Sequence, residues 1–180
     1  MTHPKLKEYL VPDFLSLKEG DENLKGYDAC FYCTGVSSVG MKEAEYSRIT
    51  YDTTIHFANV LVQQNPEMTF IYVSGAATDG SEKGRVMWAR VKGKTENALA
   101  KMPFKKVYNF RPGFMKPTPG QKNTLKMYTY IGWMYPFFKT VFPNSTSTLK
   151  QVGRAMINSL INGPDKQTLE VKDIKQLGNS

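Results

Sequence analysis

The stretch TFIYVSGAATDGSEKGRVMWARVKGKTE, from Thr69 to Glu96, decides the fold of this chain. It opens with an apolar run, Phe70 to Val73, which has the length and composition of a buried strand. The small residues Ser74-Gly75 follow, and a helical pattern then runs from about residue 86 to residue 102 and carries Lys92. A buried strand, a small-residue turn at its carboxyl end and a helix that offers one lysine favour half of a nucleotide site.

Strand and helix patterns alternate on both sides of this stretch. We expect further strands at residues 29–34, 106–110 and 169–171, and helices at 42–64, 125–142 and 149–161. Buried strands that alternate with helices are typical of an α/β fold with a mostly parallel sheet and right-handed crossovers. The length of 180 residues favours a single domain. We assign residues 27–113 to its sheet core, and residues 114–180 to C-terminal helices on the substrate side and a last strand.

The carboxyl ends of the three predicted central strands carry small or turn-forming residues. They read Thr34-Gly35, Ser74-Gly75 and Arg111-Pro112-Gly113. In open parallel sheets, ligands bind outside the carboxyl ends of the strands, where the backbone must come close to the ligand. The three segments therefore predict the location of a ligand crevice.

The net charge of +8 is concentrated in one part of the chain. Residues 83–126 hold twelve Lys and Arg residues and one acidic residue, Glu96. Such a segment favours an anionic partner, either a phosphorylated cofactor, nucleic acid or an acidic membrane, although a solvated basic face without any partner is equally compatible. Because no nucleic-acid-binding module is present, we do not expect a nucleic-acid partner.

The cysteine and histidine content gives little support to redox or metal chemistry. Cys30 and Cys33 are the only cysteines, and residues three apart on a strand point to opposite faces, so the two thiols cannot easily pair. Neither His3 nor His56 lies in a metal-binding pattern, and we expect no metal site. The start of the chain has no apolar signal-peptide region, and together with the absence of a disulfide framework this favours a cytoplasmic location.

Four segments together resemble the short-chain dehydrogenase/reductase superfamily. They are Thr34-Gly35, Tyr72-Val73-Ser74, Lys92 with Glu96 in a K-x-x-x-E helix, and Arg111-Pro112-Gly113. The chain is most similar to the atypical or extended branch of NAD-dependent epimerase/dehydratase-like proteins. The resemblance covers roughly residues 27–175 and rests on the order and spacing of the segments together.

The resemblance implies a Rossmann-like three-layer fold that binds NAD or NADP and acts on a small carbonyl or sugar-like substrate. The basic segment slightly favours NADP. Lys92 corresponds to the lysine that holds the nicotinamide ribose, and Thr50 to the relay asparagine. The residue that binds the substrate oxygen corresponds to Ser74 or Gly75, because the usual pair of hydroxyl residues reads Ser-Gly here. Trp88 occupies the position of the catalytic tyrosine, and its indole N–H is not a usable acid. The cofactor-binding positions are Thr34, Gly35, Lys92, Arg111, Pro112 and Gly113.

The family opens with a strand, a glycine-rich G-x-x-G-x-x-G turn and a helix, and this sequence contains no such segment. Roughly forty residues of β-α-β content are expected to be missing from the N-terminal side. The chain is then either a fragment whose true start lies upstream or a naturally shortened domain. Loss of a central strand would leave an apolar sheet edge, which predicts poor solubility or self-association.

An alternative function follows from Trp88 and from the aromatic segment MYTYIGWMYPFFKTVF at residues 127–142. With tryptophan in the tyrosine position, the chain is compatible with a catalytically inactive dinucleotide-fold protein that binds a protein partner or a membrane surface. The aromatic segment is too interrupted to span a bilayer, and it predicts either interfacial membrane contact or a helix that covers the substrate side of the sheet.

Overall fold

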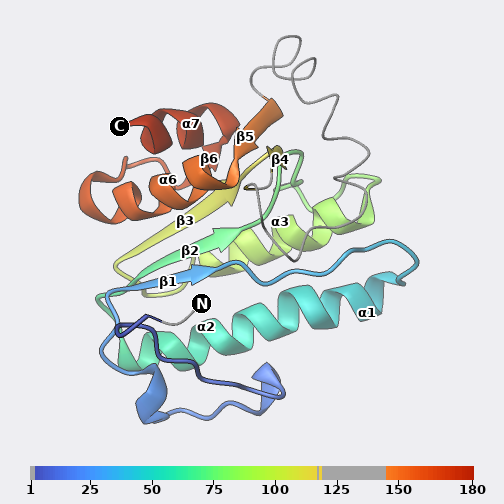
Figure 1. The fold of residues 1–180 in the computed structure, drawn as a ribbon. Helices are drawn as coiled ribbons and strands as arrows, with labels where there is room; N and C mark the ends of the chain where they lie inside the picture. Colours follow the sequence, from blue (N-terminus) through green and yellow to red (C-terminus); the bar gives the residue numbers. More distant parts are fainter. Residues whose placement is uncertain (1–2, 117, 119–144) are drawn as a thin grey trace.

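The computed structural model describes residues 3–116, 118 and 145–180, and its centre is a parallel β-sheet (Figure 1). The sheet has four strands in the order β1 (Ala29–Tyr32), β2 (Thr69–Val73), β3 (Lys106–Arg111) and β6 (Thr168–Glu170). Every neighbouring pair in this sheet is parallel. The predicted α/β fold with a parallel sheet is therefore confirmed.

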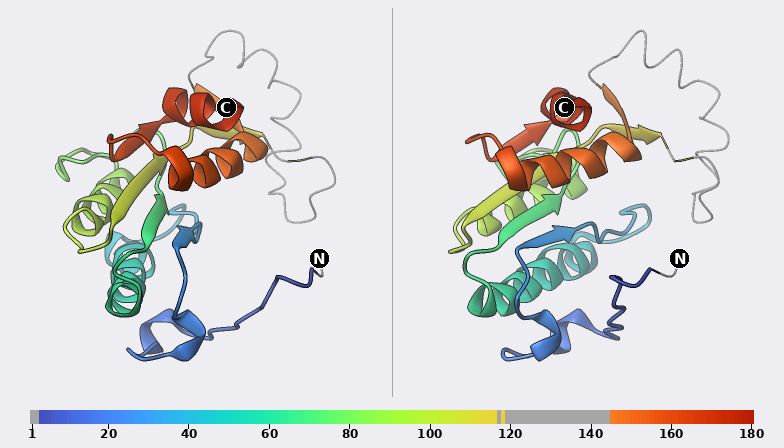
Figure 2. Two further views of the ribbon diagram at one scale, coloured as in Figure 1. Left: turned by 90° about the vertical axis from the view of Figure 1, so that its left-hand side faces the viewer. Right: turned by 60° about the vertical axis from the view of Figure 1, so that its left-hand side comes forward.

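Helices cover both faces of the sheet and make three layers (Figures 1 and 2). One face is covered by α2 (Thr53–Gln64) and α3 (Met87–Leu99), and the other by α6 (Leu149–Asn162) and α7 (Val171–Asn179). A short helix, α1 (Glu43–Ser47), precedes α2, and two 3-10 turns, η1 (Phe14–Ser16) and η2 (Glu22–Leu24), lie in the N-terminal segment. The arrangement is that of a Rossmann-like three-layer fold.

Strand β2 shows how the sequence pattern produces the two hydrophobic cores. Its side chains alternate between the faces of the sheet. Phe70 and Tyr72 pack with residues of α2 and α3, whereas Ile71 packs with residues of α6 and α7. Because both faces are buried, the strand is a continuous apolar run rather than an alternating one.

The long helix expected at residues 42–64 is present, since the backbone is helical from Glu43 to Gln64. Its hydrogen bonding changes over five residues, η3 (Arg48–Asp52), which form a π-turn between α1 and α2. A π-turn has wider hydrogen-bond spacing than an α-helix and such turns occur frequently at functional sites. Asn65 ends α2, and its side-chain Oδ1 accepts hydrogen bonds from the backbone N–H groups of Gly26 and Tyr27.

The C-terminal part of the chain contains a small second sheet and a last helix, α7 (Val171–Asn179), that we did not expect from the sequence. A separate two-stranded parallel sheet joins β4 (Phe114–Lys116) to β5 (Thr146–Thr148). Val171, expected in the last strand, instead begins α7. The helix expected at residues 125–142, and with it the aromatic segment 127–142, lies outside the described residues.

Strand β1 forms one edge of the main sheet. Within residues 3–116, 118 and 145–180 it pairs only with β2, and the side chain of Phe31 is 41% exposed. Over the same residues, no helix is long and apolar enough to cross a membrane.

Candidate functional site

The backbone segments that follow β2 and β3 remain hydrogen-bonded to each other beyond the ends of the strands. The backbone N–H of Ser74 donates to the carbonyl of Phe110 at 2.8 Å, and that of Ala76 donates to Pro112 at 3.1 Å. Two of the three predicted crevice segments therefore lie side by side at the carboxyl edge of the sheet. Thr34-Gly35 follows β1, whose last residue is paired in register with Tyr72, and both residues are exposed.

Lys92 lies next to Ser74, as expected if the two residues share a site. Its Nζ donates to the backbone carbonyl of Ser74 at 2.6 Å and lies 6.0 Å from the centre of the Tyr72 ring. Burial lowers the pKa of Lys92, and the nearby carboxylate of Glu96 opposes this effect. Within the described residues, the Lys92 ammonium group makes one hydrogen bond, to Ser74, and it carries three hydrogens.

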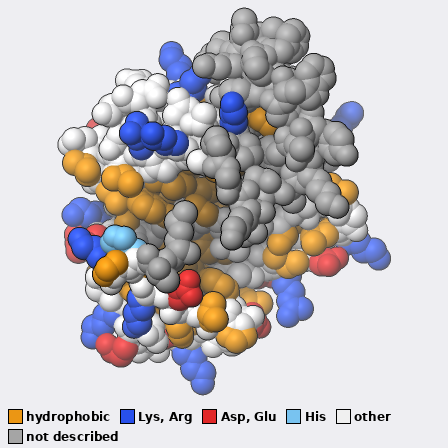
Figure 3. Space-filling model, in the orientation of Figure 1, with side chains coloured by type: hydrophobic (Ala, Val, Ile, Leu, Met, Phe, Trp, Pro, Cys, Tyr) orange, Lys and Arg blue, Asp and Glu red, His pale blue; other side chains and the backbone are white. Residues whose placement is uncertain are grey.

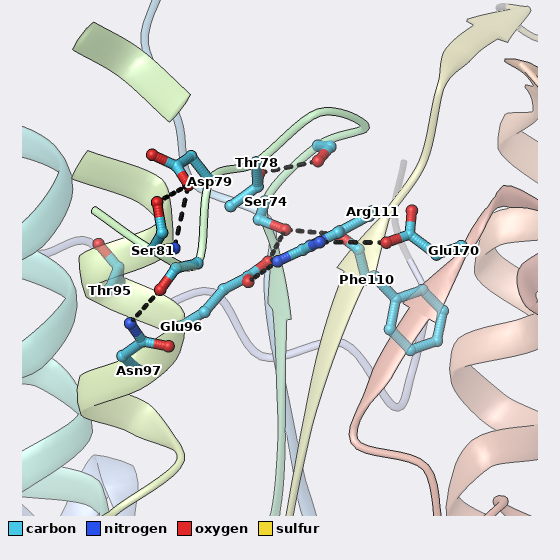
Figure 4. A network of polar contacts seen from close by, with 12 residues as sticks. Ser74, Thr78, Asp79, Ser81, Thr95, Glu96, Asn97, Phe110, Arg111 and Glu170 are labelled. Atoms are coloured by element: carbon cyan, nitrogen blue, oxygen red, sulfur yellow. Dashed lines mark hydrogen bonds and ion pairs between the residues drawn. The ribbon is translucent and has the colours of Figure 1, made fainter. Parts of the chain in front are cut away.

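A buried ion pair between Glu96 and Arg111 connects the helix to the ends of the strands (Figure 4). Glu96 is 3% exposed, and its Oε1 accepts from Arg111 Nε at 3.0 Å while its Oε2 accepts from Nη2 at 2.5 Å. Arg111 Nη1 donates to Glu170 Oε1 at 3.1 Å. Hydrogen bonding to Glu96 is the main cause of the raised pKa of Arg111.

This pair also holds the side chain of Ser74. Ser74 Oγ lies 2.5 Å from Glu96 Oε1 and 3.2 Å from the carbonyl oxygen of Phe110. The sequence placed Ser74 and Arg111 at the site but did not anticipate that Glu96 joins them. One feature of the sequence could have indicated that Glu96 pairs with a basic residue. Glu96 is the only acidic residue in residues 83–126, which contain twelve Lys and Arg residues.

Trp88 lies in the first turn of α3 and is half-buried. A Cβ atom placed on Gly75 would lie 3.9 Å from Cζ3 of the Trp88 ring. The indole therefore packs beside the turn that follows β2, one helical turn before Lys92. The structure thus places Trp88 at the same edge of the sheet as Ser74 and Lys92.

Thr50 is less closely connected to the other predicted site residues. It lies in η3, is 8% exposed, and its Oγ1 has no hydrogen-bond partner within the described parts of the chain. Although η3 packs against α3, no hydrogen bond joins Thr50 to Ser74, Trp88 or Lys92 among the residues described. Its assignment as a relay residue remains a prediction.

The loop between β2 and α3 is held in place by Asp79. This carboxylate accepts hydrogen bonds from Ser81 N at 3.0 Å, Ser81 Oγ at 2.6 Å and Gly84 N at 2.6 Å, and the bond from the Ser81 side chain is the main cause of its lowered pKa. The backbone of Asp79 also donates to Ala89 in α3 at 3.1 Å. Gly93 permits this close approach, because a Cβ there would lie 1.8 Å from the Asp79 carbonyl oxygen.

Basic residues are dispersed, and several are already paired. On the face shown in Figure 3, Lys and Arg side chains are scattered among apolar and acidic ones. Arg90 forms an ion pair with Glu43 at 2.6 Å, and Lys105 lies 3.7 Å from Glu67. The basic side chains that this view shows therefore do not form one continuous patch on this face.

The cysteines and other potential metal ligands show no arrangement for redox or metal chemistry in the described ranges. Burial raises the pKa of Cys30 to about 12, which disfavours a reactive thiolate. Both cysteines are free thiols. No group of three or more His, Cys, Asp and Glu side chains in residues 3–116, 118 and 145–180 could hold a metal ion.

The fold is similar to two solved structures that contain nicotinamide dinucleotides. RMD from Pseudomonas aeruginosa, complexed with NADPH, matches with a TM-score of 0.63 and 17% identity over 93% of this chain and 68% of that chain. MoeE5, in complex with UDP-glucuronic acid and NAD, matches with a TM-score of 0.55 and 14% identity over 94% of this chain and 67% of that chain. No protein-family model and no curated protein matches the sequence. At these identities the likeness establishes a shared fold.

Proposed function

We propose that this protein binds a nicotinamide dinucleotide at the carboxyl edge of its sheet and belongs to the oxidoreductase- or epimerase-like proteins. Its substrate is a small carbonyl or sugar-like molecule. The observation that carries this proposal is the position of Lys92, whose ammonium group meets the end of β2 at Ser74. Two proteins of the same fold that hold NADPH or NAD support it.

The residues at this edge offer suitable contacts for a dinucleotide. The ammonium hydrogens of Lys92 that do not contact Ser74 can bind the ribose hydroxyls, which are good acceptors. Thr34 and Gly35 follow the end of β1, and Arg111, Pro112 and Gly113 lie at the end of β3, and the proposal assigns the backbone of these residues to the cofactor contact. When bound, a nicotinamide ring supplies hydride transfer, while the protein supplies binding and orientation.

A fluorescence titration tests this proposal directly. NADH and NADPH are added separately, and the emission of Trp88, which lies beside Gly75, is followed in a W133F background so that Trp88 is the sole tryptophan. We expect a saturable change that K92M weakens about tenfold, the size of one lost hydrogen bond to a charged group. K101M, which removes an exposed lysine just beyond α3, is the matched control and should bind like the wild type. If neither NADH nor NADPH produced a saturable change in fluorescence, the proposal would be excluded.

The choice between NAD and NADP is decided by the same titration. The basic segment favours NADP, because an additional phosphate on the ribose is attracted to Lys and Arg side chains. Of those residues, Arg90, Lys105 and Arg111 already contact carboxylates. We expect tighter binding of NADPH, and the preference should fall as the salt concentration rises.

The second candidate is a catalytically inactive dinucleotide-fold protein that binds a protein partner or a membrane surface. The observation that favours it is Trp88, which occupies the position of an acid it cannot replace. The aromatic segment at 127–142 supplies the membrane part of this candidate. Co-sedimentation with anionic vesicles tests it, and recovery of the protein only in the supernatant would exclude membrane contact.

A further inference from the structure

We propose that Ser74 is a hydrogen-bond acceptor toward the ligand, and that Glu96 and Arg111 are the positioning residues that impose this role. The group that meets Ser74 is then a hydroxyl rather than a carbonyl. The assignment of a ligand to this edge of the sheet rests on the proposed function, but the hydrogen-bonding role of Ser74 follows from the contacts described above.

The first step is the charge of Glu96. Both of its carboxylate oxygens accept from the guanidinium of Arg111, Oε1 from Nε and Oε2 from Nη2. An arginine side chain stays protonated and has only donors. A carboxyl that accepts from such a group on both oxygens, inside the protein, is ionised. Glu96 therefore has no hydrogen to donate to Ser74.

The second step is the single hydroxyl hydrogen of Ser74. A serine hydroxyl carries one hydrogen and two lone pairs. Among residues 3–116, 118 and 145–180, Ser74 Oγ has two hydrogen-bond partners, Glu96 Oε1 and the carbonyl oxygen of Phe110, and both are acceptors. Whether Glu96 or Phe110 accepts the hydroxyl hydrogen of Ser74, that hydrogen points into the protein. A lone pair is what remains for any group that approaches from outside.

The backbone of Ser74 is committed as well. Its N–H donates to Phe110 and its carbonyl accepts from Lys92. A ligand therefore meets an acceptor at Ser74 Oγ and, beside it, the remaining donors of Lys92. A pair of neighbouring hydroxyls matches this arrangement, because one hydroxyl can donate to Ser74 while the other accepts from Lys92. A carbonyl oxygen offers Ser74 only another acceptor.

This result changes the role that the resemblance implied for Ser74. A serine that binds and polarises a substrate carbonyl must donate its hydrogen to that oxygen. In this chain Glu96 takes the hydrogen first. The acidic residue four positions after Lys92 thus determines the chemical class of the ligand, although it is buried and does not face the ligand itself.

The hydroxyl hydrogen can be observed by NMR in the wild-type protein without any cofactor, using selectively labelled serine. We expect the Ser74 hydroxyl proton to exchange with water at least about tenfold more slowly than in E96Q, because a hydrogen bond to a carboxylate is stronger than one to an amide. S74A identifies the resonance by its loss. A Ser74 hydroxyl that exchanges in the wild type as fast as an exposed serine would overturn the proposal.

The ligand class is tested on the same samples with glycerol and acetone at equal concentration. We expect glycerol to shift the amide resonance of Ser74, and acetone to leave it unchanged. A response to acetone, or to neither probe, would overturn the assignment of a hydroxyl ligand. Because no nucleotide is present, these results are independent of the NADH and NADPH titration, so failure of either proposal can be recognised separately.

Discussion

Arg111 contacts Glu96 through two nitrogens, with Nε 3.0 Å from Oε1 and Nη2 2.5 Å from Oε2. The carboxylate comes from α3 and the guanidinium from the end of β3. Glu96 is buried and Arg111 is half-buried, and Arg111 also contacts Glu170 at 3.1 Å.

We expect E96A to lower the free energy of unfolding by about 1.5–3 kcal/mol, since the half-buried Arg111 would keep only Glu170 as a carboxylate partner and Ser74 Oγ would lose its contact with Glu96. Urea unfolding followed by far-UV circular dichroism measures the change. E43A is the control, because it removes a partner from the more exposed Arg90–Glu43 pair and should cost at most about 1 kcal/mol. Equal losses in the two variants would contradict the prediction.

Gly93 should not tolerate a side chain. A methyl group there would meet the carbonyl oxygen of Asp79, so we expect G93A to destabilise the protein by about 1–3 kcal/mol, as other overpacked sites do. G153A is the matched control on α6, where no atom lies within 4 Å of the added carbon. Since alanine is the better helix former, G153A should stabilise by about 0.5–1 kcal/mol. Thermal unfolding of both variants decides the question, and a neutral G93A would show that the loop moves aside.

The lowered pKa of Lys92 predicts a pH dependence of stability. In the folded protein its pKa lies below the usual 10.5, so over the interval between these two values the unfolded chain binds more protons. Stability then rises with pH across that interval, as the penalty for burying the charge disappears. We expect the free energy of unfolding of the wild type, measured relative to K92M, to increase as the pH rises toward 10.5. A constant difference would show that burial does not affect Lys92.

Trp88 is the position at which an acid could be restored. W88Y places a phenol four residues before Lys92, and a positioned acid or base typically contributes about 10²–10⁴-fold to a rate. We expect W88Y to reduce NADP⁺ with glycerol about 100-fold faster than W88F, which has the ring without the hydroxyl. The assay follows NADPH absorbance, and intact binding of NADPH to both variants is the control. Equal rates in W88Y and W88F would show that the position no longer supports catalysis.

The sequence predicted well those elements that are encoded locally. Strand β2 begins and ends at the expected residues, and α3 lies within the expected range. An apolar run that ends at Ser74-Gly75 and a helical pattern that ends before Pro103 are strong signals, because strand burial and helix termination act over few residues. The neighbouring positions of Ser74 and Lys92 followed from the same two elements.

Other features depend on distant parts of the chain and were not predicted. The π-turn η3 needs one residue more per turn than the apolar pattern indicates, and it is stabilised where it packs against α3. Glu96 and Arg111 are separated by a turn and most of a strand, so only the parallel crossover brings them together. Helix α7 differs from these, because its apolar residues Val171, Ile174 and Leu177 recur every three positions, which is a local helical signal that the assignment of Val171 to a strand overlooked.

The three contacts of Arg111 have a consequence for how the protein opens. Glu96 belongs to a helix on one face of the sheet, and Glu170 caps α7 on the other face. The guanidinium of Arg111 therefore links both helical layers to the end of β3. Separation of either layer from the sheet would break its hydrogen bonds with Arg111. Amide hydrogen exchange in α3 and in α7 should then be cooperative, with both helices exposing their backbone in a single opening event.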